Sequence, residues 1–153
     1  MAFISPSDAD QVRAYFADNL QDPVTIRAFT EQKSLLTVPG RHECEYCEET
    51  VQLLQEVVDL SDKLSLEVFD LRSAPQAGDA YGIQPSMVPA FVLEGHNQGS
   101  VRNFGIPAGY EFSTLIQDLV DVSKGSTTLT QATRDELAQL AEDVHIRVFV
   151  TPT

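Results

Sequence analysis

Residues 42–60 read HECEYCEETVQLLQEVVDL, and most of the fold can be inferred outward from them. Cys44 and Cys47 stand three apart and are followed by apolar residues at helical spacing as far as Ser61, which predicts an amphipathic helix. We expect Cys44 at the N-cap, where unpaired backbone N–H groups and the helix dipole favour a thiolate and make the sulfur nucleophilic. Cys47 lies one turn further on, within reach of the first sulfur. Such a pair at a strand-to-helix junction is typical of thiol–disulfide exchange.

Two other interpretations of the cysteine pair stay open at this point. His42, Cys44 and Cys47 are three ligands of the types that zinc takes, but structural zinc uses four protein ligands. The remaining histidines, His96 and His145, lie on other predicted elements. Unpaired cysteines are also common as inert core residues. We expect disulfide exchange rather than either alternative, with no metal and no cofactor beyond a redox-active Cys44–Cys47 disulfide.

Helical and strand patterns alternate along the rest of the chain. They predict helices over 7–20, 44–61, 109–123 and 130–142, and strands over 24–30, 64–71, 87–93, 100–104 and 145–150. Ser7 is the expected N-cap of the first helix and Thr130 that of the last. Residues 31–41 form a loop or a strand extension, and 73–82 have room for one short helix. This order predicts an α/β chain with a mixed central sheet and helices on both faces.

A second candidate for the site is Val88-Pro89, where a proline opens an apolar strand after a turn-rich segment. We expect a cis peptide bond at Pro89, with Pro85 as the alternative proline. The proline ring cannot donate to a strand ladder, which leaves the backbone of Val88 free for an extended peptide. Val88 and Pro89 are therefore candidate substrate-binding residues.

The end of the chain repeats an earlier strand. Residues 24–30, VTIRAFT, match 144–151, VHIRVFVT, and each copy follows a short acidic helix. The shared Ile-Arg-x-Phe core favours a repeated structural unit over chance similarity. A strand over 145–150 without a sheet of its own presents an unpaired edge, which favours pairing with a second copy or back onto its own sheet. We therefore include a homodimer through 145–150 among the expected partners.

Length and composition exclude several classes of protein. The chain has 153 residues with 42% apolar content, which fits one globular domain with or without an appendage. Its formal net charge of −13 repels phosphate backbones and anionic lipids, so we expect neither nucleic-acid nor membrane binding. The first residues do not resemble a signal peptide, and no apolar run approaches the roughly 20 residues of a membrane span. We expect a cytoplasmic protein.

Together these residues give the chain a resemblance to the glutaredoxin-like protein disulfide oxidoreductases, which contain two thioredoxin-fold units in tandem. It resembles their N-terminal unit over nearly its whole length. The segments that carry the resemblance are CEYC (44–47), LSDKLS (60–65), VPA (88–90), FGIPAGYEF (104–112), DLVDVS (118–123) and VFVTPT (148–153). The resemblance implies a thioredoxin-fold unit over 1–125, and over 126–153 a helix and strand like the start of a second, truncated unit. Two segments, 31–41 and 82–89, are longer than is usual in the family.

The resemblance implies dithiol–disulfide exchange on protein substrates, with Cys44 as the attacking thiol and Cys47 as the resolving one. Val88 and Pro89 would bind the substrate backbone. A reductase or a peroxiredoxin would be the redox partner, since the family is similar to a domain that feeds electrons to peroxiredoxins. The competing hypothesis is a non-catalytic thioredoxin-fold module for binding or assembly, in which the cysteines are incidental.

Acidic residues surround the cysteine pair: Glu43, Glu45, Glu48 and Glu49. Negative charge raises the pKa of a thiol, and a less stable thiolate makes the couple more reducing. Arg41 and a protonated His42 oppose this effect. We expect a potential nearer that of thioredoxin, about −270 mV, than that of strongly oxidising periplasmic proteins, about −120 mV. Glu45 is the carboxylate expected to tune the chemistry, and Tyr46 is expected to pack beside the disulfide and limit access to Cys47.

Overall fold

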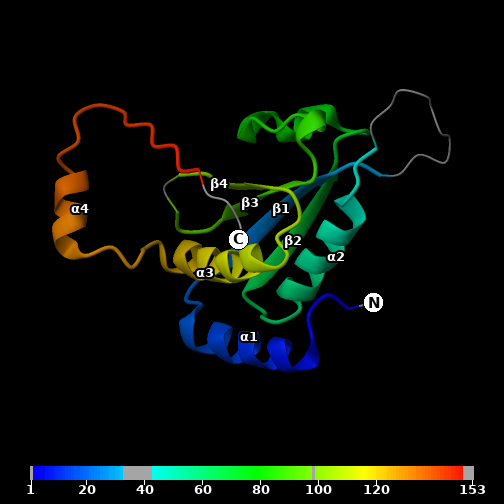
Figure 1. Cartoon of the computed structure of the whole chain (residues 1–153), viewed down its shortest axis with the longest axis horizontal. Helices are drawn as coiled ribbons and strands as arrows, with labels where there is room; N and C mark the ends of the chain where they lie inside the picture. Colours follow the sequence, from blue (N-terminus) through cyan, green and yellow to red (C-terminus); the bar gives the residue numbers. More distant parts are fainter. Residues whose placement is uncertain (1, 33–42, 98, 150–153) are drawn as a thin grey trace.

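The structure is a computed structural model that describes residues 2–32, 43–97 and 99–149 (Figure 1). Its elements, in chain order, are α1 (Pro6–Asn19), β1 (Val24–Thr30), α2 (Cys47–Val58), β2 (Leu64–Asp70), the 3₁₀ helices η1 (Pro75–Tyr81) and η2 (Pro85–Met87), β3 (Ala90–Glu94), β4 (Val101–Phe104), α3 (Tyr110–Lys124) and α4 (Gln131–Leu137). Within these ranges, every helix is too short or too polar to cross a membrane.

β1 lies in the interior of a four-stranded sheet with the order β2-β1-β3-β4. β1 and β2 run parallel, with Val24 opposite Leu64 and Thr30 opposite Asp70, and α2 makes the crossover between them. β3 runs antiparallel to β1, and β4 antiparallel to β3. The mixed sheet that the sequence predicts is confirmed, and β1 has the predicted bounds.

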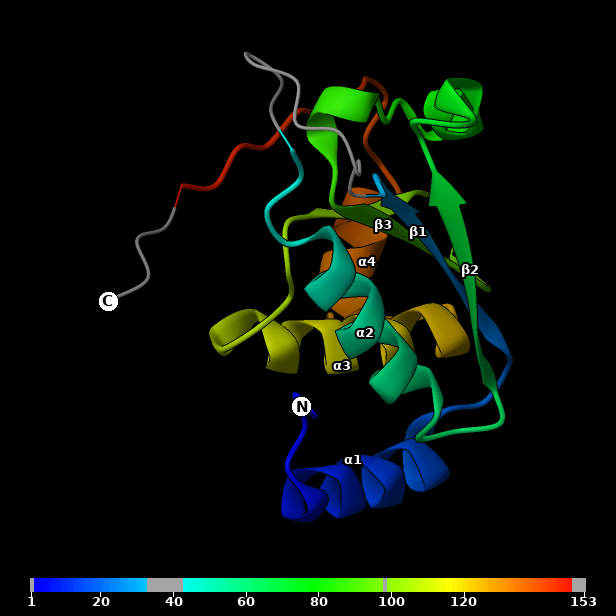
Figure 2. The ribbon, with the colours of Figure 1, turned by 90° about the vertical axis from the view of Figure 1, so that its right-hand side faces the viewer.

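The larger core lies on one face of the sheet, where α2 and α3 pack and α1 packs against α3 (Figure 2). Alternate residues of β1, namely Val24, Ile26 and Ala28, point into this core and are almost fully buried. The helices contribute mainly Phe16 from α1, Leu54 and Val57 from α2, and Leu115, Leu119 and Val120 from α3. Burying a Val, Leu, Ile or Phe side chain contributes about 1.5–3 kcal/mol, so this cluster contributes more to stability than the smaller one on the opposite face.

A smaller cluster covers the opposite face near the carboxyl end of β1. Phe29 stacks on Phe69 with ring centroids 5.5 Å apart and contacts Tyr81 of η1 at 5.6 Å. Leu71, Ile83, Ala90 and Val92 complete the cluster. Helical elements therefore occupy both faces, as predicted, but the second face is covered by a 3₁₀ helix, consistent with the short helix expected in 73–82.

Several element ends differ from the predicted ones for local reasons. α1 begins at Pro6, and Ser5 rather than Ser7 is its N-cap, because the Ser5 Oγ accepts from the backbone N–H of Asp8 at 3.2 Å and proline suits the first helical position. β3 begins at Ala90 rather than at Met87, because η2 precedes it and Pro89 has no N–H for the ladder.

The C-terminal part of the chain differs most from its prediction. Thr130 is the N-cap of α4, as expected, but α4 ends at Leu137, well short of residue 142. The predicted strand is wrong over its described part, 145–149, which carries no regular structure. A strand needs a ladder partner, and in the described part of the chain this segment has none. The start of a second unit at 126 stays a prediction.

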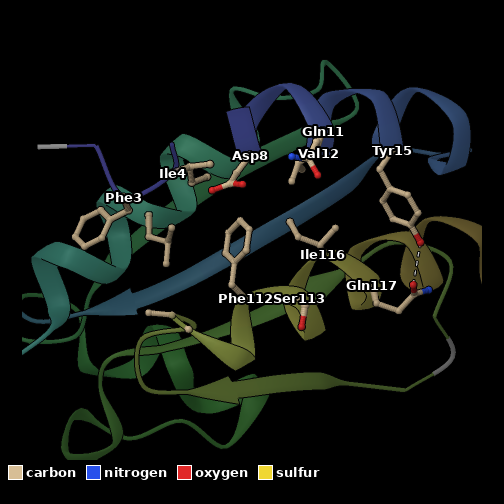
Figure 3. A pocket seen from close by; sticks show the side chains of 13 residues that line it. Phe3, Ile4, Asp8, Gln11, Val12, Tyr15, Phe112, Ser113, Ile116 and Gln117 are labelled. Atoms are coloured by element: carbon tan, nitrogen blue, oxygen red, sulfur yellow. Dashed lines mark hydrogen bonds between the residues drawn. The ribbon is translucent and has the colours of Figure 1, made fainter. Parts of the chain in front are cut away.

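A groove of about 500 Å³ lies between α1 and α3, with side chains of the two helices facing one another across it (Figure 3). At one end the Tyr15 hydroxyl donates to Gln117 Oε1 at 2.9 Å. At the other end the backbone N–H groups of Phe3 and Ile4 donate to the Glu56 carboxylate of α2. Neither cysteine lines this groove, so it is separate from the site described next.

Candidate functional site

Cys44 and Cys47 form a disulfide with a Cα–Cα separation of 5.6 Å at the start of α2. The two sulfurs differ in environment, because Cys47 is only 2% exposed whereas Cys44 is half-buried. A molecule approaching from solvent therefore meets Cys44 first.

The N-cap of α2 is Tyr46, and Cys44 lies two residues before it, so the expected N-cap position of Cys44 is wrong. The reason is Thr50, which is buried and bonds back to the Tyr46 carbonyl through both its backbone N–H, at 2.9 Å, and its hydroxyl, at 2.6 Å. These bonds fix the first turn at Cys47. The positive end of the helix dipole therefore lies nearest the buried sulfur.

The buried sulfur has a backbone donor. The N–H of Glu31, the residue directly after β1, donates to Cys47 Sγ at 3.3 Å. The carboxylate of Glu31 is in turn paired with Arg72, whose Nε and Nη2 both lie 2.9 Å from Oε1. The side chains are only 14% and 22% exposed, so this ion pair is largely sheltered from water.

The sequence interpretation missed Glu31 and Arg72, although a signal for them exists. Glu31 follows β1 and Arg72 follows β2, and the carboxyl ends of adjacent parallel strands meet at one edge of a sheet. Opposite charges within two residues of the ends of two parallel strands therefore indicate a pair at that edge. The sequence pattern alone did not show that β1 and β2 pair in parallel, with Thr30 opposite Asp70.

Val88-Pro89 lies at the same edge of the sheet. The bond is cis, as expected for Pro89, whereas Pro85 belongs to η2. Ala90 is opposite Phe29, so Pro89 stands beside the end of β1, from which Glu31 reaches Cys47. The Pro89 carbonyl accepts from Gly105 N–H at 2.8 Å, and Val88 has an extended backbone. The structure thus brings Cys44–Cys47 and Val88-Pro89, the two pairs predicted from the sequence, to the same end of β1.

The structure describes only some of the residues that we expect to tune the chemistry of the cysteines. Glu43, Glu45 and Glu48 are exposed around the disulfide, and Glu49 is half-buried on the first turn of α2. Tyr46 is 46% exposed, and a hydrogen bond to Glu45 raises its pKa above the ordinary value. His42 and Arg41, with all of 31–41 beyond Gln32, lie outside the described residues.

Comparison with known proteins gives structural matches only. No family model and no curated protein matches the sequence. A protein disulfide oxidoreductase from Aeropyrum pernix K1 superposes with a TM-score of 0.70 at 24% identity, over 89% of this chain and 55% of that one. The alkylhydroperoxide reductase AhpF from Enterococcus faecalis gives 0.72 at 23% identity, over 90% of this chain and 61% of that one. The N-terminal domain of the same reductase gives 0.68 at 22% identity, over 88% and 59%.

These matches establish the fold. The chain has the thioredoxin-like fold that the resemblance implied, and it spans about 55–61% of the length of these three chains.

Proposed function

We propose that the chain is a thiol–disulfide oxidoreductase acting on protein substrates. The observation that carries the proposal is the unequal burial of a Cys44–Cys47 disulfide at the sheet edge that also holds Val88-Pro89. An accessible sulfur joined to a shielded one is the arrangement that two-step exchange requires. The thioredoxin-like fold shared with a protein disulfide oxidoreductase supports the same chemistry.

In the reducing direction, the Cys44 thiolate attacks one sulfur of a substrate disulfide. A bond forms between Cys44 and that sulfur, and the other substrate sulfur leaves as a thiolate and takes up a proton. The Cys47 thiolate then attacks Cys44 Sγ, which forms the Cys44–Cys47 disulfide and releases the second substrate thiolate. Two electrons pass from the dithiol to the substrate, and a thiol or dithiol reductant restores the dithiol by the reverse steps.

Neighbouring groups serve each step. The Glu31 N–H that donates to Cys47 Sγ stabilises negative charge on that sulfur when it becomes the attacking thiolate. The extended backbone at Val88 offers a substrate peptide hydrogen bonds beside the disulfide. The carboxylates near the cysteines oppose the thiolate and favour the disulfide, and we propose a potential near −270 mV on that account, of about the thioredoxin value.

The first test is a thiol titration before and after mild reduction, with Cys44→Ser and Cys47→Ser as variants. Two thiols should appear only on reduction, and the disulfide should re-form with a midpoint set by the glutathione ratio. Cys44→Ser should abolish reduction of a disulfide-bonded test protein, whereas Cys47→Ser should accumulate the mixed disulfide on Cys44. Thiols that stay free and unreactive, or that a chelator unmasks, would refute the exchange mechanism in favour of packing or metal binding.

A second candidate function is transfer of electrons to a peroxide-reducing protein, such as a peroxiredoxin. The likeness to a domain of an alkylhydroperoxide reductase favours it. The reduced chain should then reduce an oxidised peroxiredoxin much faster than it reduces an unrelated disulfide protein. Equal rates would favour the broader oxidoreductase.

A further inference from the structure

The last described segment, residues 144–149, exposes four apolar side chains. The exposed fractions are 61% for Val144, 76% for Ile146, 78% for Val148 and 89% for Phe149. Soluble chains rarely leave so much apolar surface contiguous unless something covers it. Alternate residues are apolar, with His145 and Arg147 between them, which is the pattern of a strand with one buried face.

This segment repeats the sequence of β1 at four of six positions. Val144, Ile146, Arg147 and Phe149 are identical to Val24, Ile26, Arg27 and Phe29. In β1, the first two point into the helical core and the last two point to the opposite face. There Arg27 Nη1 lies 2.6 Å from Glu67 Oε2, and Phe29 stacks on Phe69, both partners being in β2. The segment 144–149 therefore carries the side chains that β2 already accepts from β1.

β2 has one edge on which a further strand can pair. It is the outer strand of the sheet and pairs with β1 on one side only within the described residues. Val68 is 48% exposed and the Glu67 side chain 49% exposed, although both lie in a sheet strand. A groove of about 580 Å³ runs beside Val68, between the end of β1 and α2.

We propose that residues 144–149 of a second copy of this chain add to β2 as a fifth strand, parallel to β2 and in the register that β1 uses. Val144, Ile146 and Val148 then lie beside Leu64, Leu66 and Val68 on the helical face. On the opposite face Arg147 lies beside Glu67, and Phe149 beside Phe69. A carboxylate accepts more than one charged donor, so Glu67 binds Arg147 while keeping Arg27.

The other edge of the sheet fits the segment poorly. β4 has only the four residues Val101–Phe104, and Arg102 stands on the face that would receive Arg147. Like charges directly opposite one another destabilise a strand pair. β2 offers seven residues and a carboxylate at the matching position.

A second copy, rather than the same chain, is the partner because of where the segment lies. Figures 1 and 2 both place α4 and the residues after it away from β2, across the sheet. Two copies can exchange their segments about a twofold axis, and each then covers the open edge of the other. This proposal is independent of the redox function, because none of its residues is a cysteine or a residue of the Val88-Pro89 pair.

The test is a charge exchange between two single variants, read as molecular mass across a concentration series. Arg147→Glu alone and Glu67→Arg alone each place like charges together and should weaken the dimer about tenfold or more. An equimolar mixture should restore it, because the carboxylate introduced in one variant meets the guanidinium introduced in the other. In the second contact of the same mixed dimer, the unchanged Arg147 and Glu67 meet. Pairing within one chain predicts no restoration on mixing.

Two controls separate loss of the dimer contact from effects of net charge and of fold stability. Glu136→Arg changes the net charge as Glu67→Arg does, on an exposed position of α4, and should leave the dimer unchanged. Val148→Asp leaves β2 intact and should abolish the dimer even if Glu67→Arg, which also loses the contact with Arg27, weakens the fold. A wild-type chain that stays monomeric, or a dimer that neither charge reversal weakens, overturns the proposal.

Discussion

At the residue scale, the ion pair of Glu31 and Arg72 is linked to the buried sulfur through the backbone N–H of Glu31, which donates to Cys47 Sγ. Replacing Glu31 by glutamine keeps the shape and the N–H but leaves the Arg72 charge without its partner. We expect the free energy of unfolding to fall by about 1–3 kcal/mol, since the pair is mostly sheltered from water. Denaturant unfolding of the oxidised protein measures this.

Glu43→Gln is the matched control for that change, because Glu43 is an exposed carboxylate near the same cysteines. It should shift the unfolding free energy by less than about 0.5 kcal/mol. Equal losses in the two variants would mean that the ion pair stabilises nothing, and that general charge accounts for the effect.

At the scale of elements, Ser123 ties the last turn of α3 to the connection between α1 and β1. Its hydroxyl is fully buried, accepts from the backbone N–H groups of Gln21 and Asp22 at 2.9 Å and donates to the Asp22 carbonyl at 2.6 Å. Ser123→Ala leaves these buried backbone groups without their hydrogen-bond partner. We expect it to lower the free energy of unfolding, measured by heat or denaturant, by about 2 kcal/mol. Ser113→Ala, which removes an exposed hydroxyl of the same helix, should cost almost nothing, and an equal cost would refute the argument.

Gly78 allows η1 to pack closely against the backbone of Ile83, in the segment that follows η1. A Cβ at this position would lie 2.1 Å from the Ile83 carbonyl oxygen, a backbone atom that cannot rotate away. We expect Gly78→Ala to displace η1 and to lower the free energy of unfolding by roughly 1–3 kcal/mol through overpacking. Gly99→Ala meets no atom within 4 Å and serves as control. If both variants melt at the wild-type temperature, η1 is more adaptable than its packing implies.

The position of these elements was predictable from the sequence only in part. β1 has its predicted bounds because the alternation of side chains between the two faces and the preceding Pro23 both constrain them. The disulfide and the cis proline were predictable because each depends on residues that are close together in the sequence. The N-cap at Tyr46 depends on a buried Thr50 that no spacing rule identifies. The wrong prediction of a strand over 145–149 has the same cause. A sequence pattern indicates that a segment prefers an extended conformation, but it does not identify the strand with which the segment would pair.

At the scale of the whole molecule, one polar network joins three strands and η1 across the less covered face. Glu94 accepts from Tyr81 and from Arg27, each at 2.5 Å, and Arg27 also contacts Glu67. The hydrogen bond from Tyr81, followed by that from Arg27, lowers the pKa of Glu94 below its ordinary value of 4.5. The bond to Glu94 likewise raises the pKa of Tyr81.

The signs of these shifts give a pH profile for stability. Glu94 binds a proton more readily in the unfolded chain, so its contribution is present above about pH 4.5 and is lost as pH falls through its folded pKa. Tyr81 contributes below about pH 10, and that contribution is lost as pH rises through its folded pKa. The stability difference between wild type and Glu94→Gln should therefore shrink on acidification below pH 4.5. A difference that stays constant down to pH 2 would contradict this assignment.

The interior position of β1 has a consequence for how the protein is made. During synthesis β1 leaves the ribosome well before β3, because Thr25 and its β3 partner, Glu94, lie about 70 residues apart in the sequence. A nascent chain halted before β3 has therefore formed at most one ladder of its sheet and leaves an apolar strand edge open. Chaperone occupancy during synthesis should rise as β1 emerges and fall once β3 has followed it.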